Sequence, residues 1–146
     1  MKKMIIVLAV IGLLAGFAHA SDKDAAKALV EEAVTYVNSQ GKDKALAEFS
    51  KAKGAFDKGE LYVFAYDFDA RVIAHPKNPK LIGKNLADVP DNDGKLFRKE
   101  IVEIAKAKGS GWVDYKYMNP ETKKPEPKTT YLQKVGDIIV CCGTYK

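Results

Sequence analysis

One stretch of the sequence has residue types that could line a ligand-binding cavity. Residues 61–67 read Leu-Tyr-Val-Phe-Ala-Tyr-Asp, an aromatic and β-branched run typical of a buried strand. Because alternate side chains of a strand point to the same face, Tyr62, Phe64 and Tyr66 share one face of it. Flat rings with hydroxyl tips suit the wall of a small-molecule pocket. A structural aromatic core with satisfied hydroxyls is an equally open alternative.

A second aromatic strand is predicted over residues 111–117. Tyr115 and Tyr117 share one face of it and are further candidates for the pocket wall. Trp112 points the other way and is the only tryptophan of the chain. We assign Trp112 to packing rather than to ligand contact.

Catalytic chemistry finds little support in the residue pattern. Acid–base catalysis needs a positioned pair, and His75 with Asp67 is the pair that can be imagined. The sequence has no G-x-S-x-G, no H-E-x-x-H and no C-x-x-C-H, so hydrolase, zinc-protease and c-type haem interpretations have no motif. A lone histidine without carboxylates at matched spacing does not make a metal site. We expect a binding protein rather than an enzyme, with no cofactor and no metal.

Cys141 and Cys142 are adjacent near the C-terminus. Neighbouring side chains of a strand point to opposite faces, so a disulfide between them would need a distorted backbone. Packed or free thiols are therefore the expectation. The alternative function is a partner-binding or redox protein that acts through Cys141 and Cys142 and has a vestigial pocket, since an intermolecular bridge can form in an oxidising compartment.

Hydrophobic spacing predicts the elements that hold these residues. Apolar residues three and four apart predict helices over 24–40, 43–51 and 94–108. Strands are predicted over 61–67, 71–75, 111–117, 128–135 and 138–145, the last two joined by a tight turn at Gly136-Asp137. The segments 77–93 and 118–127 hold several prolines and are predicted loops. Hairpins at both ends of the strand set favour an antiparallel sheet covered by helices, an α+β fold.

The first twenty residues have the pattern of a cleaved secretory signal peptide. Lys2 and Lys3 precede a thirteen-residue apolar run, and Ala18-His19-Ala20 supplies the small residues that a signal peptidase reads. A retained membrane anchor is the less favoured alternative, because a span needs about 20 apolar residues. We expect residues 1–20 to be removed and residues 21–146 to form one domain in the periplasm or outside the cell.

Charge excludes one class of partner. The 146 residues carry a formal charge of +5. Loss of Lys2 and Lys3 with the leader leaves 22 of the 24 basic residues against 19 acidic ones, a net charge of +3. This is far from the dense basic stripe of a nucleic-acid-binding protein, so no nucleic-acid partner is expected.

Four stretches, in their order and spacing, resemble the single Cache domain, a small extracytoplasmic sensor module of bacterial chemoreceptors and kinases. They are LYVFAYDFDARVIAHP at 61–76, NPKLIGKNL at 78–86 followed by D-x-D-G at 91–94, G-x-G-W-V-D-Y-K-Y at 109–117, and P-x-P-K-T-T-Y at 125–131 followed by V-G-D-I-I-V. The resemblance covers roughly residues 24–146. It implies a PAS-like five-stranded antiparallel sheet, with a long N-terminal helix on one face and a ligand pocket on the other.

The resemblance also implies a ligand class and site residues. Members bind small carboxylates such as pyruvate, acetate or propionate. Lys128 falls on the family pattern P-K-x-[ST]-Y, and an ammonium at the mouth of an apolar pocket would give a carboxylate its counter-charge, with a second hydrogen bond from Thr130. His75, which the residues alone would make structural, lies in a His-Pro that the family places at the pocket. The full set of expected ligand-binding residues is Lys128, His75, Tyr117, Tyr115, Tyr66, Phe64, Tyr62 and Thr130.

The chain departs from the family pattern at three points. Ala70 stands where a turn glycine is usual, and Cys141-Cys142 where small residues are common. The sequence ends at Lys146, where a receptor of this family would continue, so we expect no transmembrane segment or signalling domain after it. We therefore expect a stand-alone module that binds a small organic acid, is not itself membrane-spanning after cleavage, and presents its occupancy to a membrane receptor or kinase. A homodimer is left open.

Overall fold

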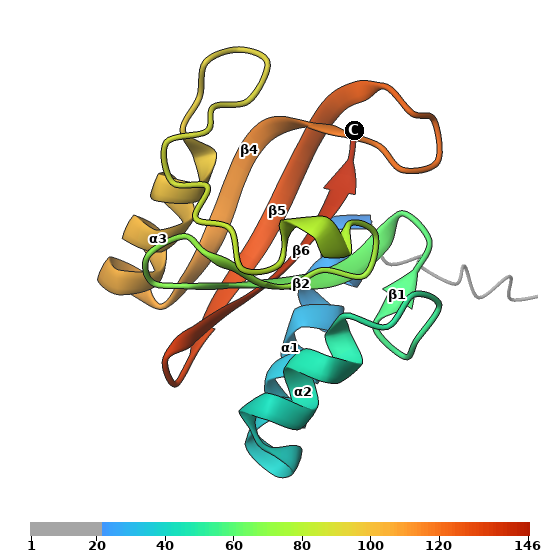
Figure 1. Cartoon of the computed structure of the whole chain (residues 1–146), viewed down its shortest axis with the longest axis vertical. Coiled ribbons are helices and arrows are strands. Elements are labelled where there is room, and N and C mark those ends of the chain that lie inside the picture. Colours follow the sequence, from blue (N-terminus) through green and yellow to red (C-terminus); the bar gives the residue numbers. More distant parts are fainter. Residues whose placement is uncertain (1–21) are drawn as a thin grey trace, which may run out of the picture.

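The computed structural model describes residues 22–146, and the expected signal peptide lies outside the described residues (Figure 1). The elements are α1 (Asp22–Gln40), α2 (Lys42–Phe49), β1 (Asp57–Lys58), β2 (Leu61–Asp67), β3 (Val72–Ala74), the 3-10 turn η1 (Pro79–Leu81), α3 (Phe97–Lys108), β4 (Ser110–Met118), β5 (Pro125–Val135) and β6 (Ile138–Tyr145). The predicted α+β class and the predicted order of the larger elements are confirmed.

The strands form one antiparallel sheet with the order β1-β2-β6-β5-β4, and β3 pairs with β2. The five predicted strands are all present, so the sheet described over residues 22–146 differs from the expected five strands only by the addition of β1. This strand consists of Asp57 and Lys58, and a pair of charged residues carries no hydrophobic pattern by which it could be predicted.

Each long strand divides its side chains between two cores, one on each face of the sheet. Helices α1 and α2 cover one face, where the small residues Val63 and Ala65 of β2 are buried. Helix α3 and the segment that precedes it cover the other face, which receives the aromatic residues of β2. In Figure 1, α1 lies behind the sheet and the β3–α3 segment crosses in front of it. The expected placement of the N-terminal helix on one face is confirmed.

Most boundaries differ from prediction by one or two residues, and the two larger differences, at α3 and β5, have identifiable reasons. Helix α3 begins at Phe97 rather than Gly94, because Gly94 has a φ of 83° and the Asp91 carboxylate accepts the Lys95 amide, which holds a turn. Strand β5 begins at Pro125, inside the predicted loop 118–127. Prolines fit there because β6 pairs with β5 only from Lys128 onward.

The β2–β3 turn contains the unusual Ala70. Its φ is 62°, in the left-handed region that glycine adopts without cost. For alanine this conformation costs roughly 1–2 kcal/mol. The Asp67 carboxylate accepts the amides of Asp69 and Arg71 at 2.9 Å each and so holds the turn despite that cost.

Candidate functional site

A row of aromatic rings forms the wall of the sheet that faces α3. Tyr62, Phe64 and Tyr66 are buried along β2, with centroid distances of 5.8 Å for Tyr62–Phe64 and 5.7 Å for Phe64–Tyr66. Small residues of β2 face α1 instead. The period-2 prediction that these three rings share one face is therefore confirmed.

Lys128 lies inside this wall and is 1% exposed. Its Nζ donates a hydrogen bond to the Tyr62 hydroxyl at 3.0 Å. The same Nζ lies 4.5–5.1 Å from the centroids of four rings, those of Tyr62, Phe64, Tyr117 and Tyr145. Ring faces attract a cation, but burial is the larger effect and lowers the pKa of Lys128 from 10.5 to about 7.

The expected position of Lys128 at the pocket mouth is wrong. Strand β5 begins three residues earlier than predicted, so Lys128 is an interior residue of the strand and its ammonium is enclosed by rings. Gly143 of β6, the partner of Thr130 across the two strands, leaves the space for the lysine stem. A Cβ at Gly143 would overlap Lys128 Cε and Thr130 Oγ1.

His75 follows β3 and is fixed in one tautomer. Its Nδ1 accepts the backbone amides of Lys77 and Asn78 at 3.2 and 3.0 Å, so the ring proton is on Nε2. The ring packs against those of Tyr62 and Phe64, at centroid distances of 5.4 and 5.8 Å. Burial, assisted by nearby cations, lowers the pKa of His75 to about 3. His75 is therefore a neutral hydrogen-bond donor throughout the physiological pH range.

The side-chain hydroxyls of Thr130 and Tyr115 are hydrogen-bonded to each other. Their hydroxyls are 2.7 Å apart, and the Tyr115 ring stacks on Phe97 of α3 at 3.9 Å with an interplanar angle of 3°. Burial raises the pKa of Tyr115 well above its ordinary value, so the hydroxyl stays protonated. Thr130 and Tyr115 thus lie at the base of the site, beneath the residues that border open space.

Arg98 is a site residue that the sequence analysis missed. It is 5% exposed, its Nε has no hydrogen-bond partner, and its Nη1 reaches the Val89 carbonyl at 3.4 Å. Arg98 and Tyr117 border the same cavity. Burial raises the pKa of Tyr117, and Arg98 opposes that rise. The sequence held one signal for it: Arg98, Ile101 and Ala105 follow the spacing of a buried helix stripe.

Two adjoining cavities lie over this wall. The tyrosine hollow, of about 190 Å³, is bordered by Tyr62, His75 and Tyr117. The arginine groove, of about 310 Å³, is bordered by Arg98 and apolar residues such as Leu81. Asn78, Met118 and Tyr117 border both cavities.

A salt bridge fixes one side of the tyrosine hollow. Lys77 Nζ lies 2.8 Å from Asp57 Oδ1, and only 3% of the Asp57 side chain is exposed. Burial opposes ionisation of Asp57, but Lys77 and two backbone amides outweigh it and lower the pKa of this carboxyl. The two-residue strand β1 therefore holds Lys77 in place beside the hollow.

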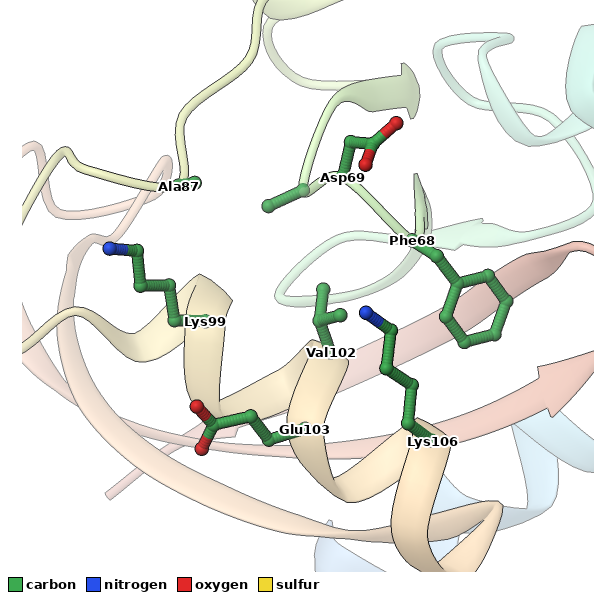
Figure 2. A pocket seen from close by; sticks show the side chains of 8 residues that line it. Phe68, Asp69, Ala87, Lys99, Val102, Glu103 and Lys106 are labelled. Atoms are coloured by element: carbon green, nitrogen blue, oxygen red, sulfur yellow. The ribbon is translucent and has the colours of Figure 1, made fainter.

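A third hollow, of about 200 Å³, lies between α3 and the β2–β3 turn (Figure 2). Asp69 of the turn and Lys99, Glu103 and Lys106 of α3 border it. These charges are of mixed sign, and none of the buried polar side chains borders this hollow. It is therefore a poorer ligand site than the two cavities over the aromatic wall.

The two cysteines are wholly buried and unpaired, on opposite faces of β6. Burial raises the pKa of the Cys141 thiol far above its ordinary value and that of Cys142 to about 12. Thiolate is the reactive form, so burial disfavours reaction of either thiol in the folded protein. The prediction of packed, free thiols is confirmed, and the alternative function through Cys141 and Cys142 stays a prediction.

Two further features bear on function. Among residues 22–146, no group of three or more histidine, cysteine or acidic residues is arranged to hold a metal ion. Over the same residues, no helix is both long and apolar enough to cross a membrane.

The comparisons with known proteins agree on one family. The family model of the Cache domain matches residues 23–145. A methyl-accepting chemotaxis protein of Pseudomonas putida, McpP, is 35% identical over 86 residues, which is 58% of this chain and 16% of that receptor. The chain thus spans less than a fifth of the length of this relative.

Solved structures show the same fold. The periplasmic sensor domain of a chemotaxis protein aligns with a TM-score of 0.67 and 29% identity, over 84% of this chain and 88% of that one. A Cache chemosensory domain that recognises carboxylic acids aligns with a TM-score of 0.65 and 28% identity, over 83% and 86%.

Proposed function

From the premise that the chain belongs to the Cache domain family of small-molecule sensor domains, we propose that it binds a small carboxylate over the aromatic wall of its sheet. The carboxylate lies against Lys128, and His75 donates to it or to a neighbouring oxygen. Pyruvate, acetate and propionate are the candidate ligands. The protein acts as a binding module and not as a catalyst.

The observation that carries the proposal is the environment of Lys128. Its ammonium is buried with one hydroxyl partner and four rings, and among the described residues it makes no ion pair. A buried cation without an anion is costly. A carboxylate ligand removes that cost and makes charge-assisted hydrogen bonds, each worth about 1.5–3 kcal/mol.

The polarity of the tyrosine hollow also supports an anionic ligand. Its border includes Lys77 and Lys123 but no aspartate or glutamate. His75 presents a donor there, as argued above. An amino acid would bring an ammonium group with no acidic partner, so we expect the site to favour simple carboxylates over amino acids.

The sensing role rests on relatives. The Pseudomonas putida relative is a chemotaxis receptor, and a similar solved structure is a periplasmic sensor domain. We propose that this chain works in the periplasm or outside the cell and presents its occupancy to a membrane receptor or kinase. A crosslinking experiment in intact cells, with ligand present or absent, tests for such a partner.

Ligand binding is tested by a thermal-shift screen of residues 21–146 against acetate, propionate and pyruvate. A ligand that binds only the folded state raises the melting temperature. We expect Lys128→Met to abolish the shift and the matched control Lys134→Met, on the same strand but exposed, to keep it. An equal shift in wild type and Lys128→Met would refute the proposed site.

A further inference from the structure

The buried ammonium of Lys128 is cut off from the open space above the aromatic wall. Lys128 is 1% exposed and is not among the described residues that border the tyrosine hollow or the arginine groove. Four aromatic rings surround its Nζ, with centroids at 4.5–5.1 Å. A ligand in either cavity therefore reaches the ammonium only after one of these rings has moved.

Tyr117 is the ring that can move with the least disturbance of the other three. Tyr62 is 1% exposed and its hydroxyl accepts a hydrogen bond from Lys128, and Phe64 is buried on the same strand. The Tyr145 hydroxyl donates to a main-chain carbonyl at 3.0 Å. Tyr117 is partly exposed and is the one ring of the four that borders both cavities, so it has open space on two sides.

Arg98 of α3 holds the Tyr117 ring in place. The two residues border the arginine groove together, and the guanidinium hydrogen-bonds to the hydroxyls of Tyr117 and Tyr66 and so opposes the rise that burial causes in the pKa of each. Arg98 is itself fixed: it is 5% exposed, lies 4.2 Å from the Phe97 ring centroid and donates to the Val89 carbonyl. Helix α3 thus supplies a rigid contact to the ring that lies between the cavities and Lys128.

We propose that Tyr117 is a self-inhibitory gate over Lys128 and that Arg98 is the positioning residue that keeps this gate closed. The inference rests on the proposed function and adds the regulation of the same site. In the empty protein, the Tyr117 ring occupies space beside the ammonium that a carboxylate needs. Ligand binding displaces the ring toward the arginine groove and alters its contact with Arg98, so occupancy of the site acts on α3.

A gate of this kind fixes the direction in which substitutions change affinity. Apparent affinity is reduced by the fraction of molecules in which the binding-competent state is populated, so a ring that covers the lysine in about nine molecules of ten weakens binding about tenfold. A variant that opens the gate therefore binds more tightly than wild type. Loss of a ligand contact or of a merely structural contact weakens binding instead.

The test is titration calorimetry of the protein with propionate. We expect Tyr117→Leu, which removes the ring, to bind about tenfold more tightly than wild type. Tyr117→Phe removes only the hydroxyl that Arg98 contacts, and Arg98→Gln removes the guanidinium. Each of these two should tighten binding at least about threefold, and the double variant no further, because both break the same contact. Tyr131→Phe deletes a hydroxyl on the α1 face of the sheet and should match wild type.

The other outcomes separate this inference from the proposed function. Weaker or unchanged binding by Tyr117→Leu overturns the gate and leaves the proposed function standing, because the ring would then contact the ligand or lie clear of it. A larger gain in the double variant overturns the role of Arg98. If Lys128→Met binds propionate as tightly as wild type, or if neither wild type nor Tyr117→Leu binds any of the three acids, the proposed function fails and the gate with it. If Tyr117→Leu does not fold, Tyr117→Phe decides the matter.

Discussion

At the scale of single residues, the protonation of Lys128 determines the net charge of the candidate site. An ordinary lysine is protonated at neutral pH, but burial brings the pKa of Lys128 to about 7. The empty site is therefore near the point at which this side chain gains or loses its proton. His75, with a pKa of about 3, and the tyrosines, whose pKa values burial raises, keep their neutral forms across that range.

Carboxylate binding is therefore expected to depend on pH. The protonated lysine binds the anion, so affinity is expected to fall by about tenfold between pH 6 and pH 8. Calorimetry in buffers of different ionisation enthalpy should show uptake of a proton on binding at pH 8. Lys128→Arg, whose charge does not titrate, is the control and should bind with no such pH dependence. Wild-type affinity that stays level from pH 6 to pH 8 contradicts the assignment.

The same residue should make the empty protein less stable than it would be with an apolar side chain. Because the folded-state pKa is below the unfolded value of 10.5, the unfolded chain binds more protons between about pH 7 and 10.5. The penalty is complete below pH 7 and disappears as pH rises through that window. We expect Lys128→Met to raise the free energy of unfolding at pH 7 by roughly 3–5 kcal/mol, and by less at pH 9. Denaturant titrations at both pH values measure the difference, and a variant less stable than wild type at pH 7 would contradict it.

Sequence reasoning predicted correctly which residues share a face of a strand, because spacing alone sets that. It failed for hydrogen-bond partners and burial that depend on contacts between distant parts of the chain. The alternation of β2 correctly separated Tyr62, Phe64 and Tyr66 from Val63 and Ala65. Spacing did not show that the Thr130 hydroxyl is already bonded to Tyr115. Arg98 was missed because a charged residue on a helix usually faces solvent, and only tertiary packing puts this one inside.

At the scale of elements, β6 leaves room for Lys128 because Gly143 has no side chain. Gly143→Ala would drive Lys128 and Thr130 out of place, because the added Cβ would overlap both. Overpacking of this kind costs about 1–3 kcal/mol, and we expect carboxylate affinity to fall at least about tenfold. Calorimetry gives the affinity and thermal melting gives the stability.

A neighbouring substitution separates binding from stability. Cys142→Ala removes a buried side chain on the α1 face of the same strand, so it should lower the melting temperature and leave affinity unchanged. If Gly143→Ala binds as tightly as wild type, the glycine is not needed to position the lysine.

The elements themselves were largely predictable, and the errors have local causes. Hydrophobic period identified α1 and α3, because each of these helices buries one face. Strands such as β2 and β6 are buried on both faces, and their aromatic and β-branched residues identified them instead. The start of β5 was missed because proline-rich residues are normally read as a loop, yet Pro125 and Pro127 pair with β4 only. The start of α3 was missed because the Asp91 turn takes up residues that the apolar spacing alone assigned to the helix.

At the scale of the whole molecule, a single sheet separates two cores, and its central strand β6 buries one thiol in each. We expect neither Cys141 nor Cys142 to react with a thiol reagent such as dithionitrobenzoate in the native state, and both to react after unfolding in guanidinium. Non-reducing electrophoresis should show no disulfide-linked dimer. Rapid native labelling would support the alternative function through the cysteines.

The position of Trp112 has a consequence for how occupancy can be observed. This single tryptophan of the chain packs on the α1 side of the sheet, next to Tyr131 and beneath Lys23 near the start of α1, whose Nζ is 4.5 Å from the ring centroid. The candidate site lies on the opposite face. Intrinsic fluorescence is therefore insensitive to direct contact with the ligand. If tryptophan emission does change when ligand is added, the change would report a shift of the N-terminal helix α1 against Trp112. The effect of filling the cavity would then have passed from one face of the sheet to the other.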